Sequence, residues 1–219
     1  MLLIDESINR RLPVSGKSWF GVRGVPKLGM EPIRRDALVK ATIAEVGRAG
    51  TLDVTMGQIA RAAGMSPALA HHYFGGKEAL FLAAMRHVMR LYGAEVRTAL
   101  AGAATPRARL SAILAASFAP ANFRRDVVGA WLNFWVMAQT VPGARRLLAV
   151  YQRRLHSNLV AALRPLAGDR AGRLADSVGA MIDGVYLREA LREGPPDAAA
   201  AVALIEAMLD AELGGRDAG

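Results

Sequence analysis

The chain has 219 residues and a formal net charge of +9, and 53% of its residues are hydrophobic, enough for one large or two small globular domains. No apolar run approaches the roughly 20 residues of a membrane-spanning helix, so we expect no membrane insertion. Cysteine is absent, which excludes disulfides, thiolate metal ligands and cysteine nucleophiles and is consistent with a reducing cytoplasm.

Residues 1–24 differ in composition from the rest of the chain, because they mix charged residues with Pro, Ser and Gly. They lack the continuous apolar segment and the small-residue cleavage site of a secretory signal. We therefore expect either a flexible leader or residues upstream of the native start of translation. A first domain then covers residues 25–77, and its first helix is predicted to begin at Pro32 and to end at Gly50.

Residues 55–64 have the pattern of a short capped helix. Thr55 and Gln58 show the spacing of a capping box, in which each side chain caps the backbone N–H of the other residue. Apolar residues follow at helical spacing. Gly64 lies just past them, where a left-handed backbone costs glycine least. The pattern predicts a helix that begins after Thr55 and ends before Gly64.

A second short helix is predicted directly after this turn. Ser66 is a favourable N-cap, and Pro67 occupies the first helical position, where its missing N–H costs nothing. The helix breaks at the Gly75-Gly76 pair, and Lys77 opens the next one. Two short helices around a glycine turn favour a helix-turn-helix, whose second helix enters the major groove of DNA. Any helical hairpin with a glycine cap would give the same pattern.

The charge distribution supports DNA binding by this end of the chain. Residues 1–90 have a net charge of +6, whereas residues 91–219 have only +3 over a longer stretch. Positive charge is needed to neutralise phosphates. We expect groove contacts from residues of the second helix and phosphate contacts from residues around it. The groove candidates are Ser66, Ala68, His71 and His72, and the phosphate candidates are Thr55, Tyr73 and Lys77.

The run from Thr55 through AAGMS, HHYF and KEAL resembles the DNA-binding signature of the TetR family of repressors. The resemblance implies an all-helical homodimer with a small N-terminal DNA-binding domain and a larger C-terminal ligand domain. It also implies that the protein binds operator DNA. The sequence has no GxSxG motif and no P-loop, so we do not expect an enzyme. The chain departs from the signature at His71, where many members carry tyrosine, so the contact made by that residue is open.

The remainder of the chain, residues 78–219, is predicted to be a helical ligand-binding and dimerisation domain. Pro and Gly residues divide it into amphipathic segments, and no run alternates as a strand would. The fold class is therefore all-α with about nine helices. The helices expected in this second domain cover residues 78–100, 106–119, 124–140, 143–163, 169–193 and 197–213.

The last two predicted helices are rich in small and apolar residues. Such a composition is usual for a core, but two adjacent amphipathic helices also suit a four-helix interface between two copies. The family resemblance implies that these two helices form the dimer. Val202 and Ile205 are the residues at which we expect a charge to disrupt it, if they lie between subunits.

Aromatic residues and one carboxylate recur in the second domain. Trp131 and Trp135 are four residues apart and share one helix face. Tyr151 lies on the next helix, and Asp183 and Tyr186 lie on the one after it. Aromatic rings with a nearby carboxylate can hold a quaternary ammonium ion, which has no N–H to donate. Alternatively, these rings are ordinary core residues and Asp183 is paired with an arginine such as Arg188.

Four further segments resemble the branch of the family that represses glycine-betaine synthesis and responds to choline. They are PKLGMEPIRR (26–35), AWLNFW (130–135), RRLHSNLV (153–160) and IDGVYLREAL (182–191). The resemblance covers residues 25–213. It implies choline as the effector, and we expect no cofactor.

Two other functions are compatible with the same residues. One is a regulator of the same family for another ligand, such as a cationic drug or an acyl compound, and the other is a helical binding protein without DNA function. His71 and His72 do not suggest a metal site, because adjacent helical residues point about 100° apart.

Overall fold

A computed structural model describes residues 29–214, and within that range the secondary structure is entirely helical. The predicted leader of residues 1–24 lies outside the described residues. The α-helices are α1 (Met30–Ala49), α2 (Met56–Ala62), α3 (Pro67–Phe74), α4 (Lys77–Ala101), α5 (Pro106–Ser117), α6 (Arg125–Thr140), α7 (Pro142–Ala167), α8 (Ala171–Leu191) and α9 (Ala198–Gly214). The all-α prediction is confirmed.

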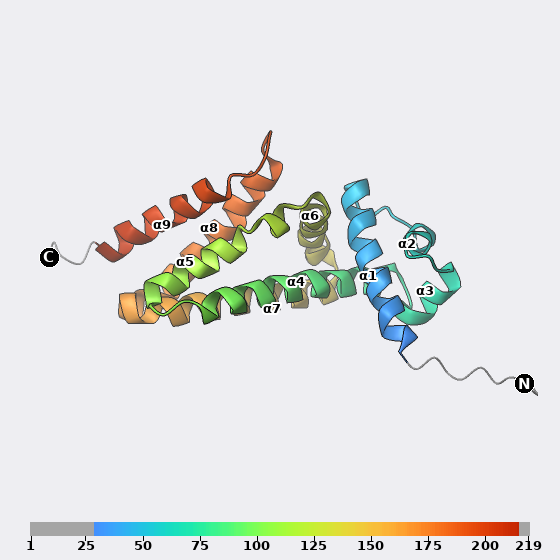
Figure 1. The fold of residues 1–219 in the computed structure, drawn as a ribbon, viewed down its shortest axis with the longest axis horizontal. Coiled ribbons are helices and arrows are strands. Elements are labelled where there is room, and N and C mark those ends of the chain that lie inside the picture. The colour runs from blue at the N-terminus through green and yellow to red at the C-terminus, as the bar shows by residue number, and fades with distance from the viewer. Residues whose placement is uncertain (1–28, 215–219) are drawn as a thin grey trace, which may run out of the picture.

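Helices α1, α2 and α3 form a small bundle at one end of the molecule (Figure 1). The predicted capping box is present, because Thr55 Oγ1 accepts from the Gln58 N–H at 3.1 Å and the Thr55 N–H donates to Gln58 Oε1 at 2.7 Å. Gly64 has a φ of 68°, as the turn prediction required. Ser66 caps α3, and the Arg35 guanidinium lies 4.6 Å from the centre of the Phe74 ring, which ties α1 to α3.

The long helix α4 begins at Lys77, directly after this bundle, and runs beside α7 to the other end of the molecule (Figure 1). Helices α5, α6 and α7 pack against it, α8 packs on α7, and α9 packs on α5 and α8. One continuous apolar core extends through both parts of the fold. Residues Leu80, Met85, Leu110, Ile113 and Leu159 are fully buried in that core. Because α4 belongs to both parts, a change in its tilt would move the helix-turn-helix relative to the rest.

The second domain differs from the prediction most at the end of α7 and at two short 3-10 helices. The helix expected to stop before Pro165 continues to Ala167, although Pro165 has no N–H to donate to the preceding turn. Burial of Leu163 and Ala167 holds this last turn in place. The gap expected after Pro120 contains a short 3-10 helix, η1 (Pro120–Phe123), and a second one, η2 (Gly168–Arg170), leads into α8.

Helices α1 and α6 cross with their backbones almost in contact. A Cβ atom on Gly47 would lie 2.1 Å from the Cα of Asp126, and one on Gly129 would lie 3.0 Å from the Cα of Gly47. The Asn133 amide on α6 also donates to the Gly50 carbonyl at the end of α1, at 3.2 Å. The part formed by α1, α2 and α3 therefore meets the second part through α6 as well as through α4.

Helices α8 and α9 close the fold and present an outer face of small and apolar residues. Leu187 and Leu191 on α8 and Leu204 on α9 are exposed. Ile205, in contrast, is fully buried and Val202 is half-buried against the same chain's core. Charges at these two positions would disturb folding, so Leu204 is the better position at which to test an interface.

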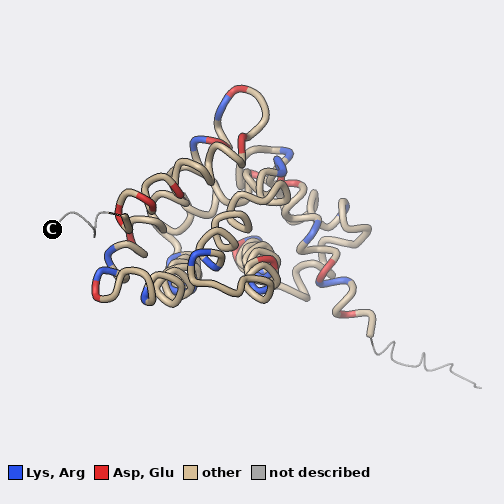
Figure 2. The backbone as a smooth tube through the Cα atoms, turned by 60° about the vertical axis from the view of Figure 1, so that its left-hand side comes forward, with Lys and Arg blue, Asp and Glu red and all other residues tan. Residues whose placement is uncertain are grey.

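Half of the positive charge expected at the DNA-binding end lies outside the described residues. Residues 1–28 hold five Lys or Arg and two Asp or Glu, which is half of the net charge of residues 1–90. Within the described residues, Lys and Arg positions are spread along the backbone and are not confined to one end (Figure 2).

Candidate functional site

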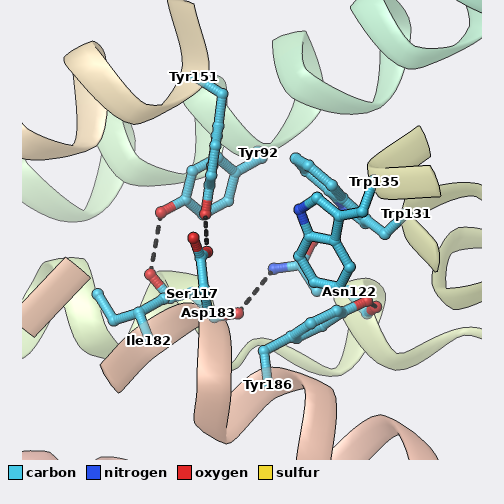
Figure 3. Close-up of a pocket in the computed structure, with 9 residues that line it drawn as sticks. All are labelled: Tyr92, Ser117, Asn122, Trp131, Trp135, Tyr151, Ile182, Asp183 and Tyr186. Carbon is cyan, nitrogen blue, oxygen red and sulfur yellow. Dashed lines mark hydrogen bonds between the residues drawn. The ribbon is translucent and has the colours of Figure 1, made fainter. Parts of the chain in front are cut away.

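A cavity in the second part of the fold brings together all five ligand-binding residues predicted from the sequence. It lies between six elements, and Figure 3 shows their side chains converging on it. Its volume is about 30 Å³, counted as the space that the centre of a water molecule can occupy. The lining residues are Tyr92 from α4, Ser117 from α5, Asn122 from η1, Trp131 and Trp135 from α6, Tyr151 from α7, and Ile182, Asp183 and Tyr186 from α8.

Four aromatic rings form the wall of this cavity, here called the cage: Trp131, Trp135, Tyr151 and Tyr186. The ring centres of the two tryptophans are 5.9 Å apart, as their spacing on one helix predicted. Trp131 lies 5.0 Å from Tyr151, and Trp135 lies 6.3 Å from Tyr186 in an edge-to-face arrangement. Aromatic rings at these separations stabilise one another, and their faces line the cavity.

Asp183 places a carboxylate at the edge of the cage. The Tyr151 hydroxyl donates to its Oδ1 at 3.0 Å, and among the described residues it has no arginine partner, so the predicted alternative of an ion pair with Arg188 is wrong. Burial raises the pKa of Asp183, and the Tyr151 hydrogen bond opposes that shift. The carboxylate is therefore only partly compensated, and a cation beside it would stabilise its charged form.

The tyrosine hydroxyls of the site are already used in internal hydrogen bonds. The Tyr186 hydroxyl donates to the Asn122 carbonyl at 2.7 Å, and that of Tyr92 lies 2.9 Å from Ser117 Oγ. Burial raises the pKa of Tyr92 to about 12 and also raises the pKa values of Tyr151 and Tyr186, so all three stay neutral. The cage consequently offers ring faces and one carboxylate rather than free hydroxyl donors.

Three polar residues of the site were missed by the sequence analysis. Tyr92 and Ser117 lie within helices that were predicted, but neither was named as a site residue. Asn122 lies in η1, where no helix was predicted, and its amide is held by the Ala116 carbonyl at 2.9 Å. The sequence did offer one signal for Tyr92 and Ser117. Each carries a hydroxyl on an otherwise apolar helix face, and a buried hydroxyl needs a hydrogen-bond partner, so the two could have been predicted to pair.

The DNA-reading candidates lie on the outer side of the helix-turn-helix. Ser66, Ala68, His71 and His72 are exposed, whereas Ala70 on the opposite side of α3 is fully buried. This orientation leaves the predicted groove-facing residues available to a ligand as large as a DNA duplex.

Two of the residues predicted to contact phosphate already make hydrogen bonds within the protein, so only their remaining donors are available to DNA. Thr55 Oγ1 is an acceptor in the capping box, so its hydroxyl hydrogen is still available. The Lys77 ammonium donates to the Leu52 carbonyl at 2.9 Å, which leaves two of its three donors for phosphate. Tyr73 is half-buried beside His72.

Two family models match the chain in consecutive segments. One is described as bacterial regulatory proteins of the tetR family and covers residues 38–84. The other is described as the C-terminal domain of BetI-type transcriptional repressors and covers residues 106–214. The residues between the two matches, 85–105, cover the rest of α4 and the segment that follows it.

Relatives along nearly the whole chain are transcriptional regulators. The HTH-type transcriptional regulator BetI of Brucella anthropi is 51% identical over 192 residues, which is 87% of this chain and 99% of the relative. The BetI of Rhizobium meliloti is 48% identical over 86% of this chain and 94% of its own length.

Solved structures with the same fold include two regulators. One from Pseudomonas aeruginosa superimposes with a TM-score of 0.76 at 29% identity, over 84% of this chain and 92% of that chain. A regulator from Saccharomonospora viridis, whose structure holds choline, superimposes with a TM-score of 0.74 at 20% identity, over 82% and 96% of the two chains.

Within residues 29–214, no group of three or more His, Asp or Glu side chains is placed to hold a metal ion. No helix in that range is long and apolar enough to span a membrane.

Proposed function

We propose that this chain, which belongs to the TetR family of transcriptional regulators and is not an enzyme, represses genes for the conversion of choline to glycine betaine and leaves its operator when choline binds. The observation that carries the choline assignment is the aromatic cage with the partly compensated carboxylate of Asp183 at its edge. Relatives named BetI and the choline complex of the Saccharomonospora viridis regulator support it.

In this proposal each cage residue has a physical role toward choline. A trimethylammonium group cannot donate N–H hydrogen bonds, so it is held by the negative faces of the rings of Trp131, Trp135, Tyr151 and Tyr186. Asp183 supplies the opposite charge or accepts from the choline hydroxyl. Each well-placed ring would contribute about 0.5–2 kcal/mol, more when water is excluded.

The small size of the cavity suggests how choline acts on the DNA-binding part. A space of about 30 Å³ accommodates a water molecule or two but not a quaternary ammonium ion. Choline would therefore have to separate the helices that carry the cage. A ligand shifts the equilibrium between two conformations only when it binds one of them more tightly. In this proposal the two conformations are the closed cage and the open cage, and choline binds the open one.

Two elements would carry this movement to the reading helices. Helix α6 holds both tryptophans and crosses α1 with Gly47 and Gly129 in contact. Helix α4 holds Tyr92 and continues from the end of α3. We propose that opening of the cage displaces α6 and tilts α4, which changes the position of α3.

The active form in this proposal is a homodimer formed through α8 and α9. One short recognition helix makes too small a specific interface, whereas two copies would read half-sites about 34–36 Å apart. The exposed Leu187, Leu191 and Leu204 on these two helices support this face as the interface.

Titration of choline into a complex of the purified protein with a labelled promoter fragment of choline-oxidation genes tests the proposal. We expect a salt-dependent complex that dissociates as choline is added. DNA binding without any choline effect would instead favour a regulator of this family for another ligand. Absence of DNA binding at low salt would contradict the repressor function itself.

A further inference from the structure

We infer that a groove between α4 and α7, outside the cage, is a second ligand site for an organic anion with an apolar body. The groove has a volume of about 740 Å³ on the same measure that gives about 30 Å³ for the cage. Five arginines line it, and no Asp or Glu is among its lining residues: Arg86, Arg90 and Arg97 come from α4, and Arg153 and Arg154 from α7.

None of these five guanidinium groups has a carboxylate within 4 Å among the described residues. Arg90 contacts only the ring of His87, at 2.8 Å, and Asp36 lies close enough to act on the two of them electrostatically but not to pair with Arg90. Elsewhere in the fold, arginines such as Arg107 and Arg124 are paired with aspartates. Five like charges around one groove repel one another, and a bound anion would relieve that repulsion.

The floor of the groove is apolar and the arginines form its rim. Met89, Val96 and Leu155 are buried beneath it. Gly93 lies between Arg90 and Arg97 on α4, and a Cβ there would come within 3.4 Å of Arg97 Nη1, so Gly93 leaves room for that guanidinium to fold back over the helix. An apolar floor under a cationic rim fits an amphiphile with a carboxylate or phosphate head better than a simple inorganic ion.

The groove and the cage share a wall but differ in charge. Tyr92 and Tyr151 line both. The only carboxylate that lines the cage is Asp183, whereas the groove has five positive charges, so choline is repelled from the groove and an anion from Asp183. The arginines come from both α4 and α7, so one anionic head bridging the two helices would draw them together beside the cage.

Calorimetry with three probes of equal chain length tests this site: dodecyl phosphate, dodecanoate and the neutral dodecanol. The two anions are kept below their critical micelle concentrations, and the alcohol is kept below its solubility limit. A charge-assisted hydrogen bond to arginine corresponds to about a tenfold or larger change in affinity. We therefore expect dodecyl phosphate to bind most tightly and dodecanol at least about tenfold more weakly than dodecanoate. Equal affinities of the three would overturn the anion site.

The Arg90→Gln/Arg154→Gln double variant removes one charge from each side of the groove. We expect it to bind dodecyl phosphate at least about tenfold more weakly. The matched control is Arg164→Gln/Arg173→Gln, which removes two exposed arginines outside the groove and should bind the probe as the parent does. An unchanged affinity in the groove variant would contradict the proposal.

Choline binding provides an independent readout of the same variant. The groove variant should keep the parent's affinity for choline and its thermal midpoint, which shows that the fold and the cage are intact. Loss of both ligands would point to a folding defect and would reject the assignment of these arginines to a separate site. A parallel arm uses phosphatidylglycerol vesicles: sedimentation with vesicles without binding of the monomeric probes would mean a membrane-binding surface instead.

Discussion

Asp183 illustrates the conflict between stability and binding within a single residue. Its carboxylate is partly buried, accepts one hydrogen bond from Tyr151 and lacks a positive partner among the described residues. Burial of a charge with so little compensation costs folding free energy. The residue is therefore better explained by a ligand than by the fold.

The Asp183→Asn variant should raise the thermal midpoint of the ligand-free protein and weaken choline binding by at least about tenfold. The neutral amide avoids the cost of removing a charged carboxylate from water, and its oxygen can still accept the hydrogen bond from Tyr151. Each kcal/mol gained in unfolding free energy raises the thermal midpoint by roughly 2–4 °C. Calorimetry and thermal unfolding measure the two effects. A variant that is less stable and binds choline unchanged would show that Asp183 has a structural role only.

Because the pKa of Asp183 is raised, both the stability of the ligand-free protein and its affinity for choline should depend on pH. Because the folded state holds the proton more tightly than the unfolded state, this residue makes the empty protein less stable as pH rises from the usual aspartate pKa through the raised one. Choline prefers the carboxylate, so its affinity should fall as pH is lowered through the same window. Thermal unfolding and choline calorimetry between pH 4 and about 7 test these two trends. The Asp183→Asn variant is the control and should show neither trend.

Trp135 is the cage ring best suited to substitution. It is half-buried, whereas Trp131 and Tyr186 are only 7% and 8% exposed, so their alanine variants would lose about 3–5 kcal/mol of stability as well. We expect Trp135→Ala to weaken choline binding several-fold, and Trp135→Phe to weaken it less, because a ring face remains. Equal affinity of both variants and the parent, measured by calorimetry, would exclude this ring from the site.

At the residue scale, the sequence predicted the cage members that share a helix or a simple spacing. Trp131 and Trp135 are in contact because positions four apart lie on one helix face. Asn122 was not predicted, since its place depends on the short 3-10 helix and on a hydrogen bond from Tyr186, 64 residues later. Local patterns do not specify which distant hydroxyl a loop residue will meet.

At the scale of elements, the crossing of α1 and α6 is the contact that most directly joins the cage to the DNA-binding part. No side chain separates the two backbones at Gly47 and Gly129. A displacement of α6 is therefore passed to α1 without being absorbed by a flexible side chain.

The Gly129→Ala variant tests this contact. Its Cβ would lie 3.0 Å from the Cα of Gly47, so the two helices must move apart. We expect weaker operator binding, or a weaker effect of choline on it, with choline affinity itself retained; fluorescence anisotropy and calorimetry measure these. Gly172→Ala is the matched control, because a Cβ there meets nothing within 4 Å. Normal operator release by Gly129→Ala would refute the coupling through α6.

The outer face of α8 and α9 gives a prediction for assembly. Leu204 is 54% exposed, and a charge there would be buried between subunits if this face forms the dimer. Leu204→Glu should therefore shift the protein to monomers in light scattering and weaken operator binding. Val136→Glu, which changes a 65% exposed residue on α6, should remain dimeric. A dimer in both variants would place the interface elsewhere.

Helix types and order were predictable from periodicity and caps, whereas some ends were not. The capping box at Thr55 and the Ser66-Pro67 start depend only on neighbours within a few residues, and both are present. The end of α7 depends on packing of its last turn against other elements, which outweighs the usual cost of Pro165 within a helix, about 3 kcal/mol. Sequence spacing alone gives no measure of that packing.

At the scale of the whole molecule, the proposed function makes ligand binding and DNA binding two readouts of one arrangement of helices. The cage lies between α4, α5, η1, α6, α7 and α8, and two of these helices reach the DNA-binding part directly. Choline can release DNA only if it binds the arrangement that does not fit the operator more tightly than the one that does. The proposal therefore depends first on whether the cage recognises a cation.

The measurement that tests this most directly is calorimetry with choline and with its uncharged analogue, in which a tert-butyl group replaces trimethylammonium. The two ligands have nearly the same shape, so they differ in charge alone. The cage and Asp183 predict that choline binds at least about tenfold more tightly, since ring faces and a carboxylate favour a cation. Equal affinity of the two ligands would contradict the account, because the rings would then be an apolar wall without a preference for charge.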